Sequence, residues 1–258
     1  MADPVLSSVR NAARVLKAFT PSHRVFGVSE LARCLNLSTS SVHRLLTTLE
    51  AEHLIEQDED TGKYRLGLAV YDLTAAVTPG YDLSNSLLPP MTVLRNQTGE
   101  TVQVAVLDGR QVVYIERLDS PHTLRMFLEL VGRRNWAHCT STGKVLLAHL
   151  PRIELDRLLD GWLLPAVTSQ TITDLSQLKK ELGQVRDQGY AENLGESDEG
   201  VISIAAPIRD SSLRVVAAMS VAGPAVRMEP ELGTLRFAVM EATAVASRRL
   251  GHQPGRAL

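Results

Sequence analysis

The chain contains the stretch STSSVHRLLTTLE at residues 38–50, whose side chains separate by polarity at helical spacing. The apolar residues Val42, Leu45, Leu46 and Leu49 recur every three or four positions and therefore share one side of a helix. The other side and its flanks are polar and carry Thr39, Ser40, Ser41, His43, Arg44 and Thr47. The pattern predicts an amphipathic helix from about Thr39 to Glu52.

Two shorter helices are predicted before this one. The first has apolar residues at helical spacing and should end before Pro21, with Ser7 or Ser8 as its N-cap; these apolar residues are Val9, Ala12, Ala13, Leu16 and Phe19. The second is predicted at Glu30–Asn36, with Ser29 as its cap. A polar break at residues 36–38 then separates it from the third helix, which is the helix-turn-helix pattern.

A β-hairpin is predicted next, from the segments LIEQ (54–57) and KYRL (63–66) around a turn that ends at Gly62. Such a hairpin would form a wing. Leu68–Val77 is predicted to be helical and to stop at Pro79-Gly80, with Leu68, Tyr71, Leu73 and Val77 offering apolar surface for a second chain. We therefore expect three parts: a winged helix-turn-helix at 1–68, a linker helix at 69–81 and a larger domain at 82–254.

The polar side of the third predicted helix suits DNA. The N-terminal end of a recognition helix enters the major groove, where short hydroxyls and an arginine reach phosphates and base edges. Arg44 is the candidate for a bidentate contact to guanine, and Lys63 and Arg65 on the wing for backbone or minor-groove contacts. Residues 1–50 hold six Lys or Arg and three acids. The alternative is an ordinary solvated helix face, and the neighbouring helices and wing favour DNA.

Composition fits a two-domain globular protein. The chain has 258 residues, 44% of them hydrophobic and 22% charged, with a net charge of −2. No apolar run has the length of a membrane span, and the first twenty residues lack an export signal. Of the two cysteines, Cys34 and Cys139, neither is needed in a disulfide. We expect a cytoplasmic protein without cofactor or bound metal.

The second part alternates between hairpins and helices, which predicts an α+β domain with a central antiparallel sheet. One hairpin is predicted at 101–107 and 111–118 around Asp108-Gly109-Arg110, and another at 201–208 and 214–221. A further strand is predicted at Thr123–Val131. Helices are predicted at 84–97, 143–150, 174–188 and 230–250. Pro89-Pro90 should start or kink the first of these rather than lie inside it.

The sequence resembles the IclR family of bacterial regulators over about residues 7–250. The matching segments are residues 38–50, YRLG (64–67), TGETV (98–102), VVYIER (112–117), HCTSTGK (138–144), the run 200–208 and SVAGP (220–224). The resemblance implies a winged helix, a linker helix and an effector domain with a GAF-like sheet. It also implies homodimers, paired into tetramers in many members, on palindromic operators.

The segment HCTSTGK (138–144) runs from a polar loop into an apolar helix, whose free N–H groups form a natural carboxylate site. It is not a nucleotide P-loop, because His138 and Val145 replace required residues. The resemblance implies that amides of Ser141 and Thr142 hold a small acid. It implies that the surrounding positions are Leu124, Asn135, Asn193, Val201, Ser203, Ser220 and Ala222.

Ser203 and Ser220 interrupt apolar strands, and a buried hydroxyl needs a partner, which is either a ligand or the backbone. Ala222 and Asn193 replace a serine and an acid of some family members. If Trp136 faces inward, the site would suit an aromatic or acyl group joined to a carboxylate or amide. Trp136 in a dimer interface is the alternative.

Other functions have weaker support. His138 and Cys139 are adjacent and so project in different directions, which is no evidence of a catalytic dyad; Cys139 is expected to be a small buried hydrophobe. Glu192, Glu196, Asp198 and Glu199 could bind a metal, although a solvated loop is the better interpretation. A purely architectural DNA protein would not need the large second domain.

Overall fold

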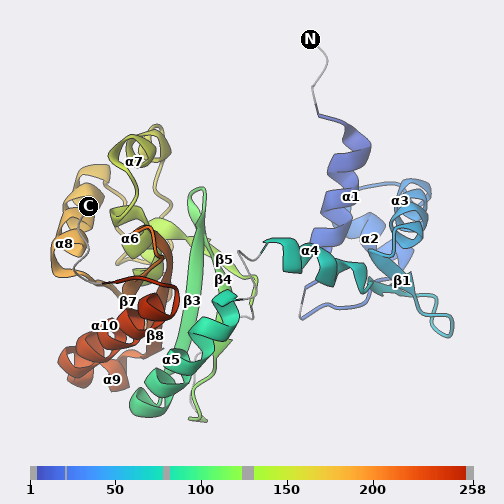
Figure 1. Cartoon of the computed structure of the whole chain (residues 1–258). Coiled ribbons are helices and arrows are strands. Elements are labelled where there is room, and N and C mark those ends of the chain that lie inside the picture. Colours follow the sequence, from blue (N-terminus) through green and yellow to red (C-terminus); the bar gives the residue numbers. More distant parts are fainter. Residues whose placement is uncertain (1–4, 21, 78–81, 124–130, 254–258) are drawn as a thin grey trace. The chain divides into compact units, whose positions relative to one another are not determined.

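A computed structural model describes residues 5–20, 22–77, 82–123 and 131–253, in two compact units, Met1–Tyr81 and Asp82–Leu258 (Figure 1). The first unit holds three helices, a hairpin and a fourth helix. These are α1 (Ser7–Ala18), α2 (Val28–Leu35), α3 (Thr39–Ala51), β1 (Ile55–Gln57), β2 (Tyr64–Leu66) and α4 (Ala69–Val77). Strands β1 and β2 pair antiparallel, so the predicted helix-turn-helix with its wing is confirmed.

The core of this unit forms where the helices meet, with Val15, Leu31, Val42 and Leu46 fully buried. Val9 belongs to the apolar residues whose spacing predicted this helix, but its side chain is 62% exposed. Val15 takes the inner position instead, because the helix turns the residues Val15, Ala18 and Phe19 toward α2 and α3.

Both predicted serine caps are wrong. Helix α1 begins after Leu6, which makes no side-chain cap. Helix α2 begins at Val28, and the Glu30 carboxylate accepts the Gly27 N–H at 3.4 Å. A first-turn acid at a helix N-terminus neutralises an otherwise unpaired amide, which a serine was expected to do.

The turn between α2 and α3 depends on Asn36, whose φ of 53° lies in the left-handed region that asparagine tolerates. The Leu37 N–H returns to the Ala32 carbonyl at 2.9 Å and closes α2. The Ser38 hydroxyl then accepts the Ser41 N–H at 3.2 Å and caps α3. Three consecutive residues thus end one helix and start the next.

The second unit is built on one antiparallel sheet of six strands in the order β5-β4-β3-β8-β7-β6. The strands are β3 (Thr101–Asp108), β4 (Gln111–Leu118), β5 (Arg134–Trp136), β6 (Ala191–Leu194), β7 (Val201–Arg209) and β8 (Val215–Pro224). Both predicted hairpins and the α+β class are confirmed. Strands β5 and β6 were not predicted, and residues 124–130 of the strand predicted at 123–131 lie outside the described residues, as does Pro79-Gly80.

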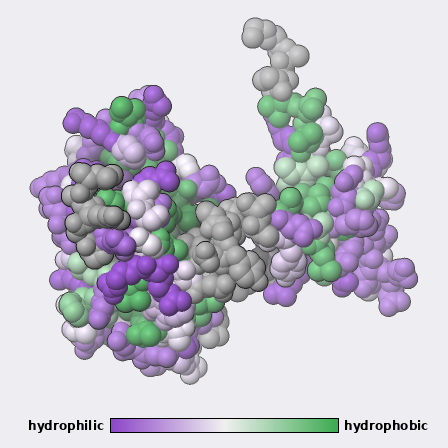
Figure 2. Space-filling view, viewed as in Figure 1, coloured by the Kyte–Doolittle hydropathy of each residue, from purple (hydrophilic) through white to green (hydrophobic). Residues whose placement is uncertain are grey.

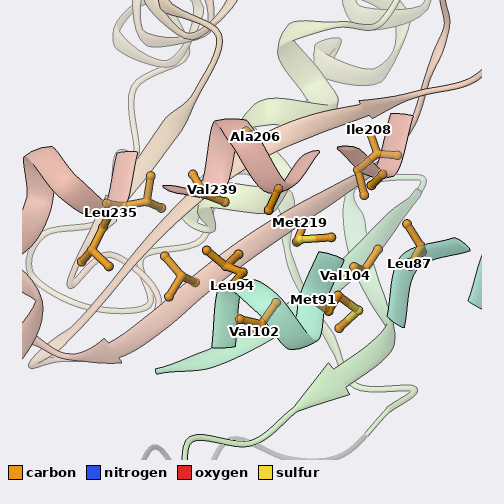
Figure 3. Packing of buried hydrophobic residues seen from close by; sticks show 14 of the residues in the cluster. Leu87, Met91, Leu94, Val102, Val104, Ala206, Ile208, Met219, Leu235 and Val239 are labelled. Atoms are coloured by element: carbon orange, nitrogen blue, oxygen red, sulfur yellow. The ribbon is translucent and has the colours of Figure 1, made fainter. Parts of the chain in front are cut away.

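Helices cover both faces of this sheet. One face packs against α5 (Asp82–Thr98) and α10 (Leu232–Arg249), and Figure 3 shows Leu87, Met91 and Leu94 of α5 against Val102 and Val104 of β3. The other face packs against α6 (Ser141–Ala148) and the elements around it, η1 (Ala137–Cys139), α7 (Arg152–Leu159) and α8 (Leu175–Gln188). Two short elements, α9 (Ala225–Met228) and η2 (Glu229–Glu231), lead into α10. No helix among the described residues is long and apolar enough to cross a membrane.

The prediction for Pro89-Pro90 is wrong, because α5 runs from Asp82 through both prolines to Thr98. Proline removes a helical N–H and costs a helix interior about 3 kcal/mol. The side chains of Leu87, Met91 and Leu94 are completely buried on both sides of the pair. Burying such side chains contributes about 1.5–3 kcal/mol each, so tertiary packing offsets the local penalty.

Helix α6 approaches η1 so closely that only glycine fits at position 143. A Cβ there would lie 2.2 Å from the Ala137 carbonyl oxygen. Every residue of α6 is buried, including Lys144. The approach fixes the N-terminus of α6 against the preceding loop and over the sheet.

We predict that Gly143→Ala lowers the free energy of unfolding of this unit by about 1–3 kcal/mol, because η1 must move to admit the methyl group. Gly183→Ala in α8 is the matched control, since nothing lies within 4 Å of its added Cβ and it should raise stability by up to about 1 kcal/mol. Denaturant unfolding followed by tryptophan fluorescence reports on this unit, which holds both tryptophans of the chain. Equal stabilities of the two variants would contradict the close approach.

Candidate nucleic-acid interface and ligand site

Helix α3 presents a continuous polar face to solvent. Its six predicted contact residues, Thr39, Ser40, Ser41, His43, Arg44 and Thr47, are all exposed. Val42, Leu46 and Leu49 are buried on the opposite side. Within the described part of the chain, no ion pair or hydrogen bond holds the Arg44 guanidinium, so it is available to a phosphate or a base. The Ser41 hydroxyl is engaged by Ser38 at 2.8 Å and contributes to the cap.

The wing carries the two predicted basic residues, and both are exposed. Arg65 already pairs with Glu56 across the hairpin, whereas no acid pairs with the Lys63 amine among the described residues. Strand β2 is anchored to the body of the unit, because Phe26 and Tyr64 exchange backbone hydrogen bonds of 2.9 and 2.8 Å. The hydrogen bonds to Phe26 therefore fix strand β2 at Tyr64, the residue next to Lys63.

The segment that was expected to hold a ligand forms the N-terminus of α6. The Thr140 hydroxyl caps the helix by accepting the Gly143 N–H at 3.2 Å. The N–H groups of Ser141 and Thr142 precede the first helical hydrogen bond and have no partner among the described residues. The Ser141 hydroxyl lies 2.7 Å from that of Ser203 on β7, so the helix end is tied to the sheet.

Strand register gathers polar residues on the sheet face beneath α6. Across β3, β8, β7 and β6, one row is formed by Thr101, Ala222, Ser203 and Asn193. The next row contains Gln103 opposite Ser220. Directly opposite residues share a face of the sheet, and their neighbours Val102, Val104 and Val221 belong to the cluster on the other face. The predicted Ser203, Ser220, Asn193 and Ala222 therefore come together.

Asn193 is buried, and its side chain donates to the Ser197 hydroxyl at 2.8 Å and accepts the Glu196 N–H at 2.7 Å. Val201 begins β7 and is half-buried. Leu124 lies outside the described residues.

Asn135, on β5, is half-buried, and its side chain lies near the Tyr114 hydroxyl together with that of Thr142. Burial raises the pKa of Tyr114, and the neighbouring Thr142 side chain opposes this rise in part. The phenol is therefore a neutral donor at physiological pH.

Trp136 is half-buried and packs in an aromatic cluster, 6.4 Å from Trp162 and 6.5 Å from His138 between ring centroids. His138 is buried, and its Nε2 lies 3.0 Å from the Pro165 carbonyl. Burial lowers the pKa of His138, so the ring is neutral and donates through Nε2. Burial also raises the pKa of Cys139 to about 12, which removes the thiolate that a catalytic nucleophile requires.

The acidic stretch after β6 is not a simple solvated loop. Glu196 is only 7% exposed, and its carboxylate accepts from the Lys144 amine at 2.6 Å, while Glu181 of α8 accepts from the same amine at 3.1 Å. A buried amine needs such partners, because an unpaired buried charge costs several kcal/mol. Among the described residues, no group of His, Cys, Asp or Glu has an arrangement that could hold a metal ion.

Sequence reasoning did not identify Gln103, Tyr114 or Lys144. The signal for Gln103 was present, because this residue interrupts the apolar strand TVQVAVL (101–107) as Ser203 and Ser220 interrupt theirs. Lys144 and Glu196 stand 52 residues apart, and only the fold reveals their contact.

Comparison with known families gives two adjoining matches. Residues 8–59 match the IclR helix-turn-helix domain, and residues 75–248 match the family described as bacterial transcriptional regulator IclR C-terminal. The chain is 33% identical to the HTH-type transcriptional regulator XynR of Escherichia coli, over 96% of this chain and 99% of that protein. It is 34% identical to the regulator KdgR of the same organism, over 97% and 93% of the two chains.

Solved structures agree with these relatives. An IclR homolog from Microbacterium hydrocarbonoxydans, complexed with 4-hydroxybenzoate, has a TM-score of 0.84 and 27% identity, and the match covers 95% of this chain and 99% of that one. The IclR protein of Thermotoga maritima has a TM-score of 0.76 and 26% identity over 95% and 99% of the two chains.

Proposed function

Because the chain belongs to the IclR family of bacterial transcriptional regulators, we propose that it binds a palindromic DNA operator through α3 and the wing, and that a small organic ligand beneath α6 changes this affinity. The observation that carries the proposal is that one chain contains both the exposed polar face of α3 in the first unit and a group of buried polar residues beneath α6 in the second. The chain is a regulator and not an enzyme, as its relatives are. We assign DNA binding to 1–68, the linker to 69–81, and ligand binding and oligomerisation to 82–254.

The DNA contacts divide into two classes. Arg44 is exposed on α3 and no described residue holds its guanidinium, which suits two parallel hydrogen bonds to guanine. The hydroxyls of Thr39, Ser40 and Thr47 and the ring of His43 surround it and reach phosphates or base edges. Lys63 and Arg65 on the wing contact the backbone or the minor groove and supply affinity without base preference.

We predict that Arg44→Ala weakens binding to the preferred duplex by about 1–3 kcal/mol and relaxes base preference at one position in each half-site. The duplex is selected from a random-sequence pool by the wild-type protein, and affinities are measured by fluorescence anisotropy. Lys63→Ala is the comparison variant: it should weaken binding to all duplexes and make the affinity less dependent on salt. If folded Arg44→Ala keeps full affinity and preference, another surface reads the bases.

One winged helix reads too few base pairs to select a site in a genome, so two copies of the chain have to bind together. The start of the linker region exposes apolar side chains, with Leu68 75%, Tyr71 73% and Leu73 54% exposed. Hydrophobic residues also gather on the face of the first unit that α1 occupies (Figure 2). We propose that a second copy covers Leu68, Tyr71 and Leu73, giving a homodimer or a dimer of dimers.

We predict that the wild-type chain sediments as a dimer or tetramer at micromolar concentration, and that Leu68→Glu with Tyr71→Glu lowers this order of assembly. Charged groups at an apolar interface would have to be buried, which opposes association. Leu163→Glu is the control, because Leu163 is 90% exposed but lies in the other unit. A wild-type monomer that binds one palindrome tightly would refute the proposal.

The ligand class follows from the N-terminus of α6. Two unused N–H groups and the positive end of the helix dipole favour a carboxylate or another carbonyl group. We propose a small carboxylate, acyl or aromatic metabolite, with Ser141 and Thr142 as its anchor and Ser203 and Ser220 as its orienting groups. Asn135, Trp136, Asn193, Val201, Ala222 and Leu124 complete the proposed surroundings.

We predict that Ser220→Ala weakens ligand binding and leaves ligand-free DNA binding unchanged, because position 220 lies in the other unit. Thr142→Pro removes one amide donor and should have the larger effect. Calorimetric titration with acetate, benzoate, hexanoate and D-gluconate measures binding, and anisotropy with the selected duplex measures the response. An effector can shift DNA affinity only by the difference in its affinities for the two arrangements. Wild-type ligand affinity in both variants would show that the site lies elsewhere.

A further inference from the structure

Three polar side chains beneath α6 are buried and unused. Gln103 is 4% exposed, Ser220 2% and Thr142 1%. The Thr142 hydroxyl is fully buried, and no described residue offers it a hydrogen-bond partner. The Gln103 carboxamide and the Ser220 hydroxyl likewise have no partner among the described residues. A buried polar group without a partner costs about as much as a lost hydrogen bond, so a polar ligand at this place would give a partner to all three groups.

Strand register puts these groups together. Gln103 and Ser220 are direct partners on β3 and β8, and they lie on the face that α6 covers. At one side of this pair, Ser141 of α6 reaches Ser203 on β7. At the other side, Thr142 lies near Tyr114 on β4, which is opposite Ala105, two residues after Gln103. The N-terminus of α6 therefore spans the position where Gln103 and Ser220 meet.

The polar side chains around this position do not suit an aromatic or alkyl ligand, which would need apolar neighbours. Gln103, Ser220, Thr142 and Tyr114 are uncharged, and each carries a hydrogen-bond donor. Arg117, opposite Gln103 on β4, donates to Asp119 at 2.7 Å. A benzene ring or an alkyl chain would leave the neutral groups unpaired, whereas ligand hydroxyls both donate to and accept from them.

Within the ligand site proposed above, and resting on that proposal, we infer that the ligand is a short carboxylate with hydroxyl groups along its chain. Its carboxylate binds the Ser141 and Thr142 amides, and its hydroxyls bind Gln103, Ser220 and Thr142. Gln103 is the residue that selects for hydroxyls, because its carboxamide donates and accepts and no protein group competes for it among the described residues. The class includes the aldonic acids.

The experiment compares acids of equal chain length on the full chain. Calorimetric titration uses three six-carbon aldonates that differ in hydroxyl configuration (D-gluconate, D-galactonate and D-mannonate), with hexanoate and 4-hydroxybenzoate as acids that lack the row of hydroxyls. We expect at least one aldonate to bind 10-fold or more tightly than hexanoate. Gln103→Leu should lower the affinity for that aldonate about 10-fold, and it should leave the affinity for hexanoate unchanged or slightly higher.

Gln97→Leu is the matched control, because Gln97 is exposed on α5, across the sheet from this site, and should change no affinity. Gln103→Glu is a second variant, whose side chain has nearly the same shape. Its negative charge should repel carboxylates and so weaken the binding of every acid tested. Tryptophan fluorescence during denaturation establishes that each variant folds.

Two results would overturn the inference. If hexanoate or 4-hydroxybenzoate binds more tightly than every aldonate, and Ser220→Ala weakens that binding, the site is correct and the ligand class is wrong. If no acid binds at millimolar concentration, both the class and the proposed carboxylate site are wrong. Equal loss of aldonate and hexanoate in Gln103→Leu would also refute a selecting role for Gln103.

Discussion

The second unit depends on how the N-terminus of α6 is held against the sheet. Gly143 permits backbone contact with Ala137, the Ser141 hydroxyl meets Ser203, and the Lys144 amine lies between Glu196 and Glu181. The ion pair is the most demanding of these contacts, because a buried amine that loses its partners is strongly destabilising. These three contacts attach one short helix to η1, the sheet and α8. The two unused amides therefore stand at a fixed distance from the polar row on β3 and β8.

Some polar side chains beneath α6 already have partners within the protein, and others do not. Ser141, Ser203 and Asn193 have their side chains committed to contacts within the protein. The side chains of Gln103, Ser220 and Thr142 have no such contact among the described residues, and the Thr142 hydroxyl is fully buried. A site of this kind needs little reorganisation on binding, since the contacts that position α6 are already made within the protein.

Much of the fold was predictable, because α3, the wing and both hairpins show strong periodicity or clear turn signals. The predictions failed where a contact distant in sequence decides the outcome. Burial of Leu87 and Met91 carries α5 through its prolines, and pairing with β7 makes a strand of four residues that include Glu192 and Asn193. The polar face of α3 and Ser203 with Ser220 were visible as interruptions of pattern. Glu196 was misjudged because composition does not reveal a partner 52 positions away.

The proline pair in α5 has a mechanical consequence. Without their N–H groups, Pro89 and Pro90 leave the carbonyls of Asn85 and Ser86 without the helical donors that every other turn provides. The backbone hydrogen bonds of α5 are thus interrupted at one point, and the burial of Leu87 before the prolines and of Met91 after them keeps both turns on the sheet. At this point α5 is held by side-chain packing rather than by backbone hydrogen bonds.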